Sequence, residues 1–234
     1  MKAPSGPFLT YNELGSTQDE AKKLIASSAE VGVVFARHQS QGRGRFDRIW
    51  VSQEGESLTF SLALHDYANH PKPYLVGMAI SLGVCLCLDA RIQWPNDVTV
   101  GGRKLGGILT ELVTDPNGNQ IPVVGAGINL NQTSFPDEIA HRATSLYIEC
   151  GLASDALTVA EGILSALANV PEPTNWEAIA PLWHQLDDTP GKQFRLPTGE
   201  EATALGVGPG GELRCLVGEE ERLVYAAEAL NLHA

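Results

Sequence analysis

The stretch RIQWPNDVTVGGRKLGGILTELV (residues 91–113) has the pattern of a β-hairpin. Its first strand covers Val98 to Val100, and Gly101-Gly102 forms a two-residue turn of the kind that needs positive φ angles. Residues 104–113 are then expected to return as the partner strand. A hairpin joins antiparallel strands, so this stretch predicts an antiparallel sheet in the middle of the chain.

Apolar runs on both sides of the hairpin extend this sheet and add helices. Thr17, followed three residues later by Glu20, has the form of a capping box and predicts that a helix begins there. Because strands and helices do not alternate strictly, we predict an α+β fold: a mainly antiparallel sheet flanked by helices. The expected strands are residues 31–37, 57–64 and 121–130, and the expected further helices are 73–90, 155–170 and 175–188.

The character of the sequence changes near Thr189-Pro190-Gly191. After this point, short strand patterns are separated by turn signals at 197–201, 208–212 and 218–221, which predicts a small β-barrel. We therefore expect two domains, residues 1–189 and residues 190–234.

Composition excludes several classes of protein. The formal net charge of −12 argues against general binding of nucleic acid, which needs an excess of Lys and Arg on one face. No uninterrupted apolar stretch reaches the ~18 residues that span a bilayer, and the first residues lack the apolar core of a signal peptide. The four cysteines form no metal-binding spacing, and Cys85 and Cys87 lie in an apolar run typical of a core. A cytoplasmic location is expected.

The segment GRGRFDRIW (residues 42–50) gathers Arg43, Arg45 and Arg48 in a glycine-containing loop of this acidic chain. Glycines let backbone N–H groups turn toward an anion, and arginines bind phosphate or carboxylate through two parallel hydrogen bonds. The alternative is a solvated loop without a ligand.

Three more clusters carry polar groups into apolar surroundings. In QWPNDV (93–98), Asn96 and Asp97 follow a proline, which suits either a binding site or a structural turn beside a buried Trp94. RKLGGIL (103–109) places two glycines inside a strand, where a ligand or another backbone can approach closely. In GAGINLN (125–131), Asn129 interrupts a buried strand, and its amide needs partners from a ligand or from the backbone.

Together with Ser16-Thr17, these four clusters resemble, in this order, the biotin–protein ligases (biotin–[acetyl-CoA-carboxylase] ligases). The resemblance covers nearly the whole chain, and residues 191–213 look like the small SH3-like barrel of that family. It implies a catalytic domain of the class II aminoacyl-tRNA synthetase type. Because the first motif begins at Ser16, the resemblance predicts a form without the DNA-binding domain and the repressor function of some members.

The resemblance also implies the chemistry. Biotin and ATP would be the substrates, with Mg²⁺ on the ATP phosphates and no metal bound by the protein alone. Biotinyl-5′-AMP would form first, and biotin would then pass to a lysine of a biotin-carrier domain, expected to be that of acetyl-CoA carboxylase. No nucleic acid or membrane partner is implied, and a homodimer is left open.

Matching positions receive roles by the same resemblance. Lys104, Arg45 and Asp97 would be catalytic, with Asp97 orienting or deprotonating the incoming lysine amine. The biotin site would comprise Ser16, Thr17, Gln18, Gln39, Arg43, Gly44, Arg45, Lys104 and Gly107. The ATP site would comprise Arg43, Arg45, Arg48, Trp50, Asn96, Lys104 and Asn129.

The chain departs from the family pattern at three places. Gln93 stands where a lysine usually precedes WPND, Gln18 replaces an asparagine, and residues 224–232 lack a usual glycine. Two rival functions stay open. One is a lipoate-type acyl ligase, because those families resemble this one in fold, and the other is a biotin or nucleotide sensor with little turnover, which Gln93 motivates. A DNA-binding regulator fits the charge least well.

Overall fold

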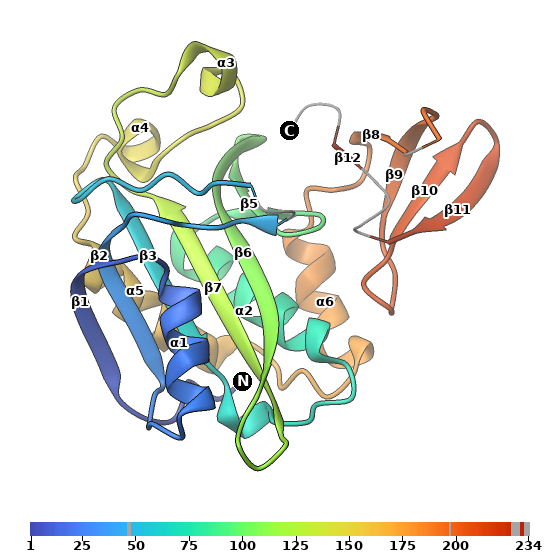
Figure 1. The fold of residues 1–234 in the computed structure, drawn as a ribbon. Helices are drawn as coiled ribbons and strands as arrows, with labels where there is room; N and C mark the ends of the chain where they lie inside the picture. Colours follow the sequence, from blue (N-terminus) through green and yellow to red (C-terminus); the bar gives the residue numbers. More distant parts are fainter. Residues whose placement is uncertain (46–47, 197, 226–229, 232–234) are drawn as a thin grey trace.

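The computed structural model describes residues 1–45, 48–196, 198–225 and 230–231. Figure 1 shows a large sheet packed between helices, with a smaller sheet beside it. The large sheet has seven strands in the order β1-β2-β3-β7-β6-β5-β4. Their bounds are β1 Phe8–Leu14, β2 Val33–Gln39, β3 Ser57–Ala63, β4 Arg91–Gln93, β5 Asp97–Val100, β6 Arg103–Thr114 and β7 Gln120–Asn129.

Strand pairing confirms the predicted α+β class with a mainly antiparallel sheet. β1 pairs with β2 in parallel, and each of the other neighbouring pairs is antiparallel. β1 and β4 were not predicted as strands. β1 is mostly solvent-accessible and β4 has three residues, so neither shows the long apolar run that marked the others.

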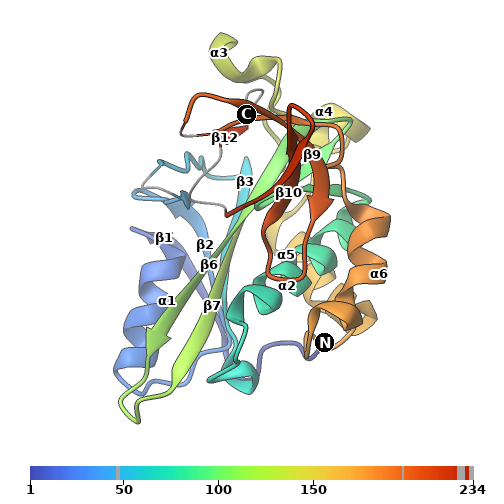
Figure 2. The same cartoon turned by 90° about the vertical axis from the view of Figure 1, so that its right-hand side faces the viewer.

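Helices cover both faces of the large sheet (Figure 2). α1 (Thr17–Ala26) lies on one face, and α2 (Pro73–Leu88), α5 (Ala156–Ala166) and α6 (Trp176–Leu186) lie on the other. α2 is apolar along nearly its whole length because the sheet, α5 and α6 surround it. Shorter helical segments are η2 His65–Tyr67, α3 Asp137–Ala140, α4 Leu146–Cys150 and η3 Leu167–Asn169.

The start of α1 corrects the predicted capping box. Ser16, not Thr17, is the N-cap, and its hydroxyl accepts a hydrogen bond from the backbone N–H of Asp19 (3.4 Å). Thr17 is already helical, and its hydroxyl shares a hydrogen bond with that of Ser61 (2.9 Å). The helix therefore begins where predicted, but the Thr17 side chain makes a tertiary contact instead of capping the helix.

The central hairpin agrees with its sequence pattern. Gly101 and Gly102 have φ angles of +57° and +76°, the left-handed values that a two-residue turn requires. β6 then pairs with β5 on one side and with β7 on the other. The register shifts between Val98 and Thr99, because Leu105 is an extra residue on β6 at this point.

The smaller sheet contains five strands in the order β11-β10-β9-β8-β12. They are β8 Gln193–Arg195, β9 Glu201–Val207, β10 Leu213–Val217, β11 Glu220–Val224 and β12 Leu230–Asn231. This sheet confirms the predicted C-terminal β structure. Pro197 in the expected turn 197–201, and residues 226–229 and 232 in the segment 224–232, lie outside the described residues.

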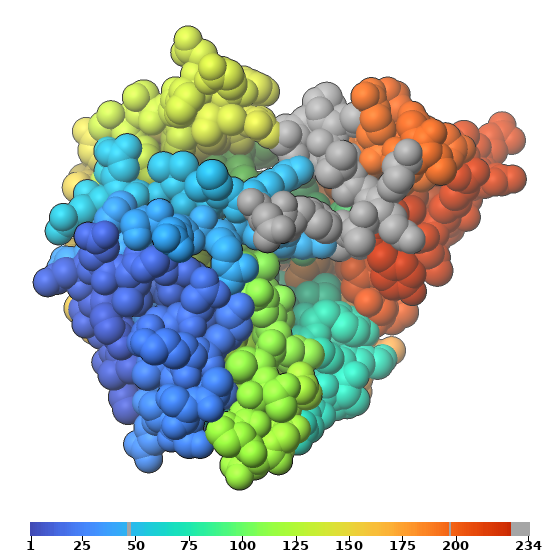
Figure 3. Space-filling view, in the orientation of Figure 1, coloured from blue at the N-terminus to red at the C-terminus, as the bar shows by residue number. Residues whose placement is uncertain are grey.

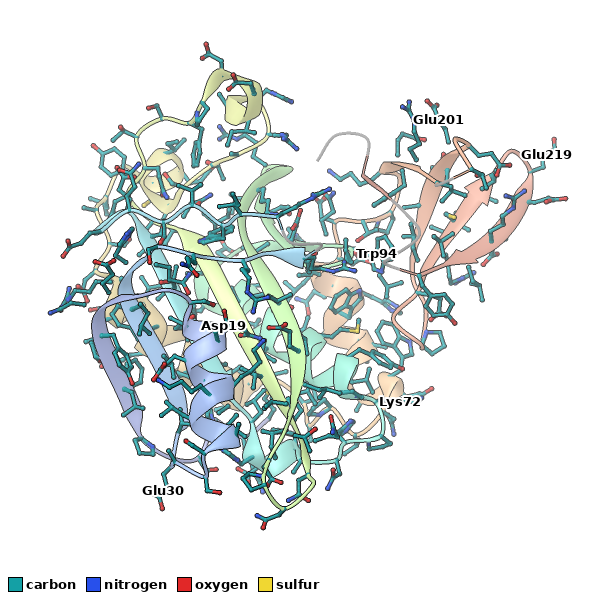
Figure 4. The ribbon with its side chains drawn as sticks, viewed as in Figure 1. Asp19, Glu30, Lys72, Trp94, Glu201 and Glu219 are labelled. Carbon is teal, nitrogen blue, oxygen red and sulfur yellow. The ribbon has the colours of Figure 1, made fainter. Side chains whose placement is uncertain are left out.

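Trp94 connects the two sheets and lies between them in Figure 4. It is buried, as the structural-turn alternative for residues 93–98 requires, and packs edge-on against Phe194 with ring centroids 5.6 Å apart. Its indole N–H donates to the carbonyl oxygen of Gly211 (2.9 Å). The peptide bond between Trp94 and Pro95 is cis. In the part of the chain described above, no helix combines the length and apolar character that crossing a bilayer requires.

Candidate functional site

A buried polar cluster surrounds the first turn of α1. The backbone N–H of Thr17 donates to Oε1 of Gln39 (2.7 Å), which ties the helix start to the end of β2. Ser16, Thr17 and Gln39 are each at most 8% exposed. Buried polar side chains must be hydrogen-bonded, so these mutual contacts keep the cluster fixed.

Gln18 belongs to the same cluster but is only half satisfied. Its Nε2 donates to the backbone oxygen of Val123 on β7 (3.0 Å). Its Oε1 is buried and has no hydrogen-bond partner among the described residues. This oxygen is beside Gly125, where a side chain would collide with it. An unpaired buried acceptor costs free energy, so this position suits a ligand that donates a hydrogen bond.

The arginine loop is a small hairpin in its described part. The backbone N–H of Gly44 donates to the oxygen of Arg48 (2.7 Å), and that of Trp50 donates to the oxygen of Gly42 (2.9 Å). Phe46 and Asp47 lie outside the described residues. Figure 3 shows the chain on either side of these two residues, at 40–45 and 48–60, on the face above α1.

Arg43 points from this loop toward α1 and β6. Its guanidinium lies 2.5 Å from a carboxylate oxygen of Asp19 and 3.5 Å from one of Glu111. Figure 4 labels Asp19 on the exposed side of α1. The structure therefore places the Arg43 side chain in a partly exposed ion-pair cluster with Asp19 and Glu111.

Trp50 covers the middle of the sheet at Gly127. A Cβ atom on Gly127 would lie within 3 Å of three indole atoms, so the ring rests directly on the glycine backbone. The indole Nε1 is buried and has no partner among the described residues. Gly127 is required here because any side chain would displace the ring.

Lys104 and Asp97 form an ion pair on neighbouring strands. The Lys104 Nζ lies 2.7 Å from Oδ1 of Asp97, with the two side chains 41% and 16% exposed. The backbone of Lys104 is held on its other side by the oxygen of Arg142 (2.7 Å) and the N–H of Thr144 (2.9 Å). Gly107 lies beside the pair, since a Cβ there would be 3.8 Å from the Lys104 Nζ.

A cavity of about 650 Å³ opens next to this ion pair. Predicted residues that line it are Arg48, Trp50, Asp97, Lys104 and Asn129. Among its described lining residues, four carry positive charge (Arg48, Lys104, Arg142 and Lys192) and two carry negative charge (Glu56 and Asp97). In a chain of net charge −12, this excess of cations indicates an anionic ligand.

Asn129 is positioned by protein contacts at the edge of this cavity. Its Nδ2 donates to the backbone oxygen of Thr144 (3.0 Å), and its Oδ1 accepts from Nε2 of Gln132 (3.4 Å). The backbone and a neighbouring amide therefore supply the partners that its buried amide needs.

Arg45 and Asn96 line a different, smaller cavity of about 290 Å³. The Nδ2 of Asn96 donates to the backbone oxygen of Ile108 (2.9 Å), which fixes the turn against β6. Burial lowers the pKa of Arg45, the charge of Asp97 opposes this, and the charge of Arg48 adds to it. Arg45 is therefore close enough to both charged groups for electrostatic interaction with each of them.

The predicted site residues thus fall into separate groups. Five line the larger cavity and two line the smaller one, while Ser16, Thr17, Gln18 and Gln39 form the buried cluster at α1. Within the described chain, Arg43, Gly44 and Gly107 line neither cavity. Several other lining residues carried no signal in the sequence. Ile139 lies in the four-residue helix α3, and the others lie in irregular segments: Gln132, Phe135, Pro136, Arg142 and Lys192.

Comparisons with known proteins agree with this architecture. The biotin protein ligase of Aquifex aeolicus, solved in complex with biotin and ATP, superposes with a TM-score of 0.73 at 26% identity, covering 95% of this chain and 97% of that chain. A second structure of the ligase from that organism superposes with a TM-score of 0.75 at 22% identity, covering 96% and 98%. The protein therefore has the fold of the biotin protein ligases.

Residues 14–129 match the model of the biotin/lipoate A/B protein ligase family, and the chain belongs to that family. The bifunctional ligase/repressor BirA of Bacillus subtilis is 37% identical over 169 residues, which are 68% of this chain and 52% of that protein. The biotin–[acetyl-CoA-carboxylase] ligase of Mycobacterium tuberculosis is 31% identical over 168 residues, 66% of this chain and 60% of that protein. The chain thus spans about half the length of the first of these relatives.

Proposed function

We propose that the protein is an ATP-dependent biotin–protein ligase. The observation that carries this proposal is the Lys104–Asp97 ion pair at the rim of a cation-lined cavity, with a buried polar cluster at α1 on the same sheet. Such an arrangement can bring a nucleotide triphosphate and a small carboxylic acid together. The similarity to a ligase solved with both biotin and ATP supports the same assignment.

The larger cavity would hold ATP. Its cations suit the triphosphate, and the Trp50 ring and the Asn129 amide lie on its wall, where an adenine can stack and form hydrogen bonds. Arg43, Arg45, Arg48, Asn96 and Lys104 complete the proposed ATP set, in which Arg45 and Asn96 belong to the wall of the smaller cavity. Mg²⁺ fits this site as an ion carried by the phosphates, since Glu56 and Asp97 offer nearby carboxylates.

The biotin head group would bind at the α1 cluster. The unpartnered Oε1 of Gln18 suits an N–H of the ureido ring, and Ser16, Thr17 and Gln39 offer further polar atoms. Gly44 and Gly107 would leave room for the ring and side chain. The biotin carboxylate would then extend toward Lys104.

The first half-reaction joins two anions. A carboxylate oxygen of biotin attacks the α-phosphorus of ATP, pyrophosphate leaves with the bonding electrons, and biotinyl-5′-AMP remains. Lys104 and Arg45 would offset the repulsion between carboxylate and phosphate and stabilise the charge that develops. Magnesium supplies additional positive charge on the phosphates when bound.

The second half-reaction transfers biotin to an amine. The deprotonated lysine of a biotin-carrier domain attacks the biotinyl carbonyl, and AMP leaves as the phosphate anion. Asp97 would orient this amine or accept its proton, a role that competes with its ion pair to Lys104. We propose the carrier domain of acetyl-CoA carboxylase as acceptor, as the name of a relative suggests.

Further features of the proposal concern the whole protein. We expect a cytoplasmic enzyme that needs neither nucleic acid nor membrane, with homodimerisation left to experiment. Residues 1–189 would form the catalytic domain and residues 190–234 the SH3-like domain.

The deciding experiment is biotin-dependent exchange of pyrophosphate into ATP, with Mg²⁺ and without a carrier protein. Exchange with biotin but not with lipoate is the expected result. Exchange with lipoate instead would favour a lipoate-type acyl ligase. Biotin binding without any exchange would identify a sensor, for which Gln93 is the motivating departure.

A further inference from the structure

Position 93 leaves the larger cavity without a cation that the family resemblance predicts there. Gln93 is the last residue of β4, is 6% exposed and pairs with Asp97 on β5. It lines the larger cavity, but its amide carries no charge. If this cavity holds a triphosphate, a positive charge from another element would compensate.

Lys192 lines the same cavity from the segment that leads into β8. Its Nζ is close to the β5–β6 turn, because a Cβ on Gly102 would lie 3.5 Å from it. Gly102 also lines the cavity and is two residues from Lys104. Among the described cations of the cavity wall, Lys192 alone comes from beyond residue 189.

The backbone around Lys192 is fixed from two sides. On one side, the N–H of Asp188 donates to the oxygen of Ile92 (2.8 Å), and the N–H of Trp94 donates to the hydroxyl of the fully buried Thr189 (2.8 Å). On the other side, the N–H of Ala204 on β9 donates to the oxygen of Lys192 (2.9 Å). The segment is therefore anchored to the two residues that flank Gln93 in sequence.

The ammonium group of Lys192 is available to an anion despite its ion pair. It lies 3.3 Å from Oδ2 of Asp188, with the two side chains 31% and 33% exposed. Ion pairs at this exposure contribute little to stability. A lysine ammonium also has three donors, so one contact with Asp188 leaves two for phosphate oxygens.

We propose that Lys192 binds phosphate oxygens of ATP in the larger cavity and supplies, from the C-terminal segment, the positive charge that residue 93 lacks. This inference rests on the proposed function. It assigns to the β8 end of the chain a direct contact with the nucleotide, in addition to its packing against Trp94.

The test compares Lys192→Gln with Arg195→Gln, a matched change three residues further along the chain, at the end of β8. Arg195 is exposed, pairs with Glu201 (3.5 Å) and is absent from the cavity wall. Lys192→Gln should raise the KM for ATP in the exchange reaction by about tenfold or more, the effect of one charged hydrogen bond. The KM for biotin, the inhibition constant of adenosine and the melting temperature should stay unchanged, because none of them depends on phosphate contacts.

A second variant tests whether the two positions are interchangeable. Adding Gln93→Lys to Lys192→Gln should restore most of the lost ATP affinity, since the charge returns to the same cavity. Equal effects of Lys192→Gln and Arg195→Gln on the KM for ATP would overturn the inference, and so would a loss of adenosine binding as large as that of ATP. In either case, exchange by the wild-type protein would still support the proposed function. A wild-type protein without exchange would overturn both.

Discussion

At the scale of single residues, the chemistry depends on a few charged groups that neighbouring strands hold at short range. Lys104 is the central one, since Asp97 fixes its ammonium and residues 142–144 fix its backbone. Its partial exposure leaves the ammonium able to contact a substrate, while Asp97 is mostly buried. This combination gives a cation with a defined position and unused donors.

Lys104→Ala should lower biotin-dependent pyrophosphate exchange by at least ~100-fold, the scale of removing one transition-state charge donor. The fold should persist, because the side chain is 41% exposed. Lys72→Ala is the control: this lysine precedes α2 on the exposed surface and is labelled in Figure 4. Exchange at a near-normal rate in Lys104→Ala would remove this lysine from the mechanism.

Arg45→Ala should shorten the time for which biotinyl-5′-AMP stays bound more than it lowers the melting temperature. The side chain lies close to Asp97 and Arg48, and burial lowers the pKa of its guanidinium, so a bound anion would add a favourable negative charge beside it. The release rate of radiolabelled biotinyl-5′-AMP measures the effect. An unchanged release rate, or a large fall in melting temperature, would contradict this role.

At the scale of elements, connections between strands and helices set the position of the site. The segment between α6 and β8 follows β4 through backbone hydrogen bonds and carries Asp187, Thr189 and Lys192. Burial raises the pKa of Asp187, although hydrogen bonding with Thr189 and the nearby Trp183 and His184 side chains oppose the shift. A carboxylate is thus partly desolvated at the junction of the two sheets.

Asp187→Asn should stabilise the protein at neutral pH. A carboxyl whose pKa is raised in the folded state favours folding below its unfolded pKa of 3.8, and this contribution is lost as the pH rises through the folded pKa. The amide keeps the oxygen that accepts from the N–H of Thr189 (2.9 Å). Urea unfolding at pH 7 and below pH 3.8 measures the gain, which should vanish at the lower pH.

The control is Glu219→Gln at the exposed β10–β11 turn. Its change in the free energy of unfolding should be the same at both pH values. A gain for Asp187→Asn that persists in acid would mean that charge is not its cause.

At the scale of the whole molecule, Trp94, which follows β4, and Tyr74, on α2, attach the smaller sheet to the rest of the chain. The indole N–H of Trp94 donates to the oxygen of Gly211, and the hydroxyl of Tyr74 donates to the oxygen of Pro209 (2.9 Å). Both acceptors belong to the turn between β9 and β10. The two sheets therefore share a packed boundary next to the smaller cavity.

Trp94→Phe should lower the free energy of unfolding by about 1 kcal/mol or more, because a buried hydrogen bond and part of the packed ring are lost. Tyr74→Phe should cost less, since its hydrogen bond is nearer the surface. Tyr147→Phe, at an exposed tyrosine of α4, is the control. Guanidinium unfolding measures all three, and a Trp94→Phe protein as stable as the control would show that this boundary contributes little.

The sequence by itself determined the elements whose signals are local. Gly101-Gly102 specifies the turn between β5 and β6 because few residues tolerate positive φ, and the apolar length of α2 predicts a buried helix. Residue types also predicted a polar and cationic site, since buried amides and loop arginines need partners. The start of α1 was found to within one residue, because capping chemistry is local.

Only the tertiary structure decided which of those groups meet. Lys104 and Gly107 are three residues apart, so a regular strand would put them on opposite faces; the bulge at Leu105 returns both to the face of Asp97. Arg43 faces acids of α1 and β6 that no local pattern connects to it. Lys192 reaches the cavity because Thr189 is anchored at Trp94, 95 residues away in the chain. Such contacts depend on long-range pairing and register, which local sequence signals do not encode.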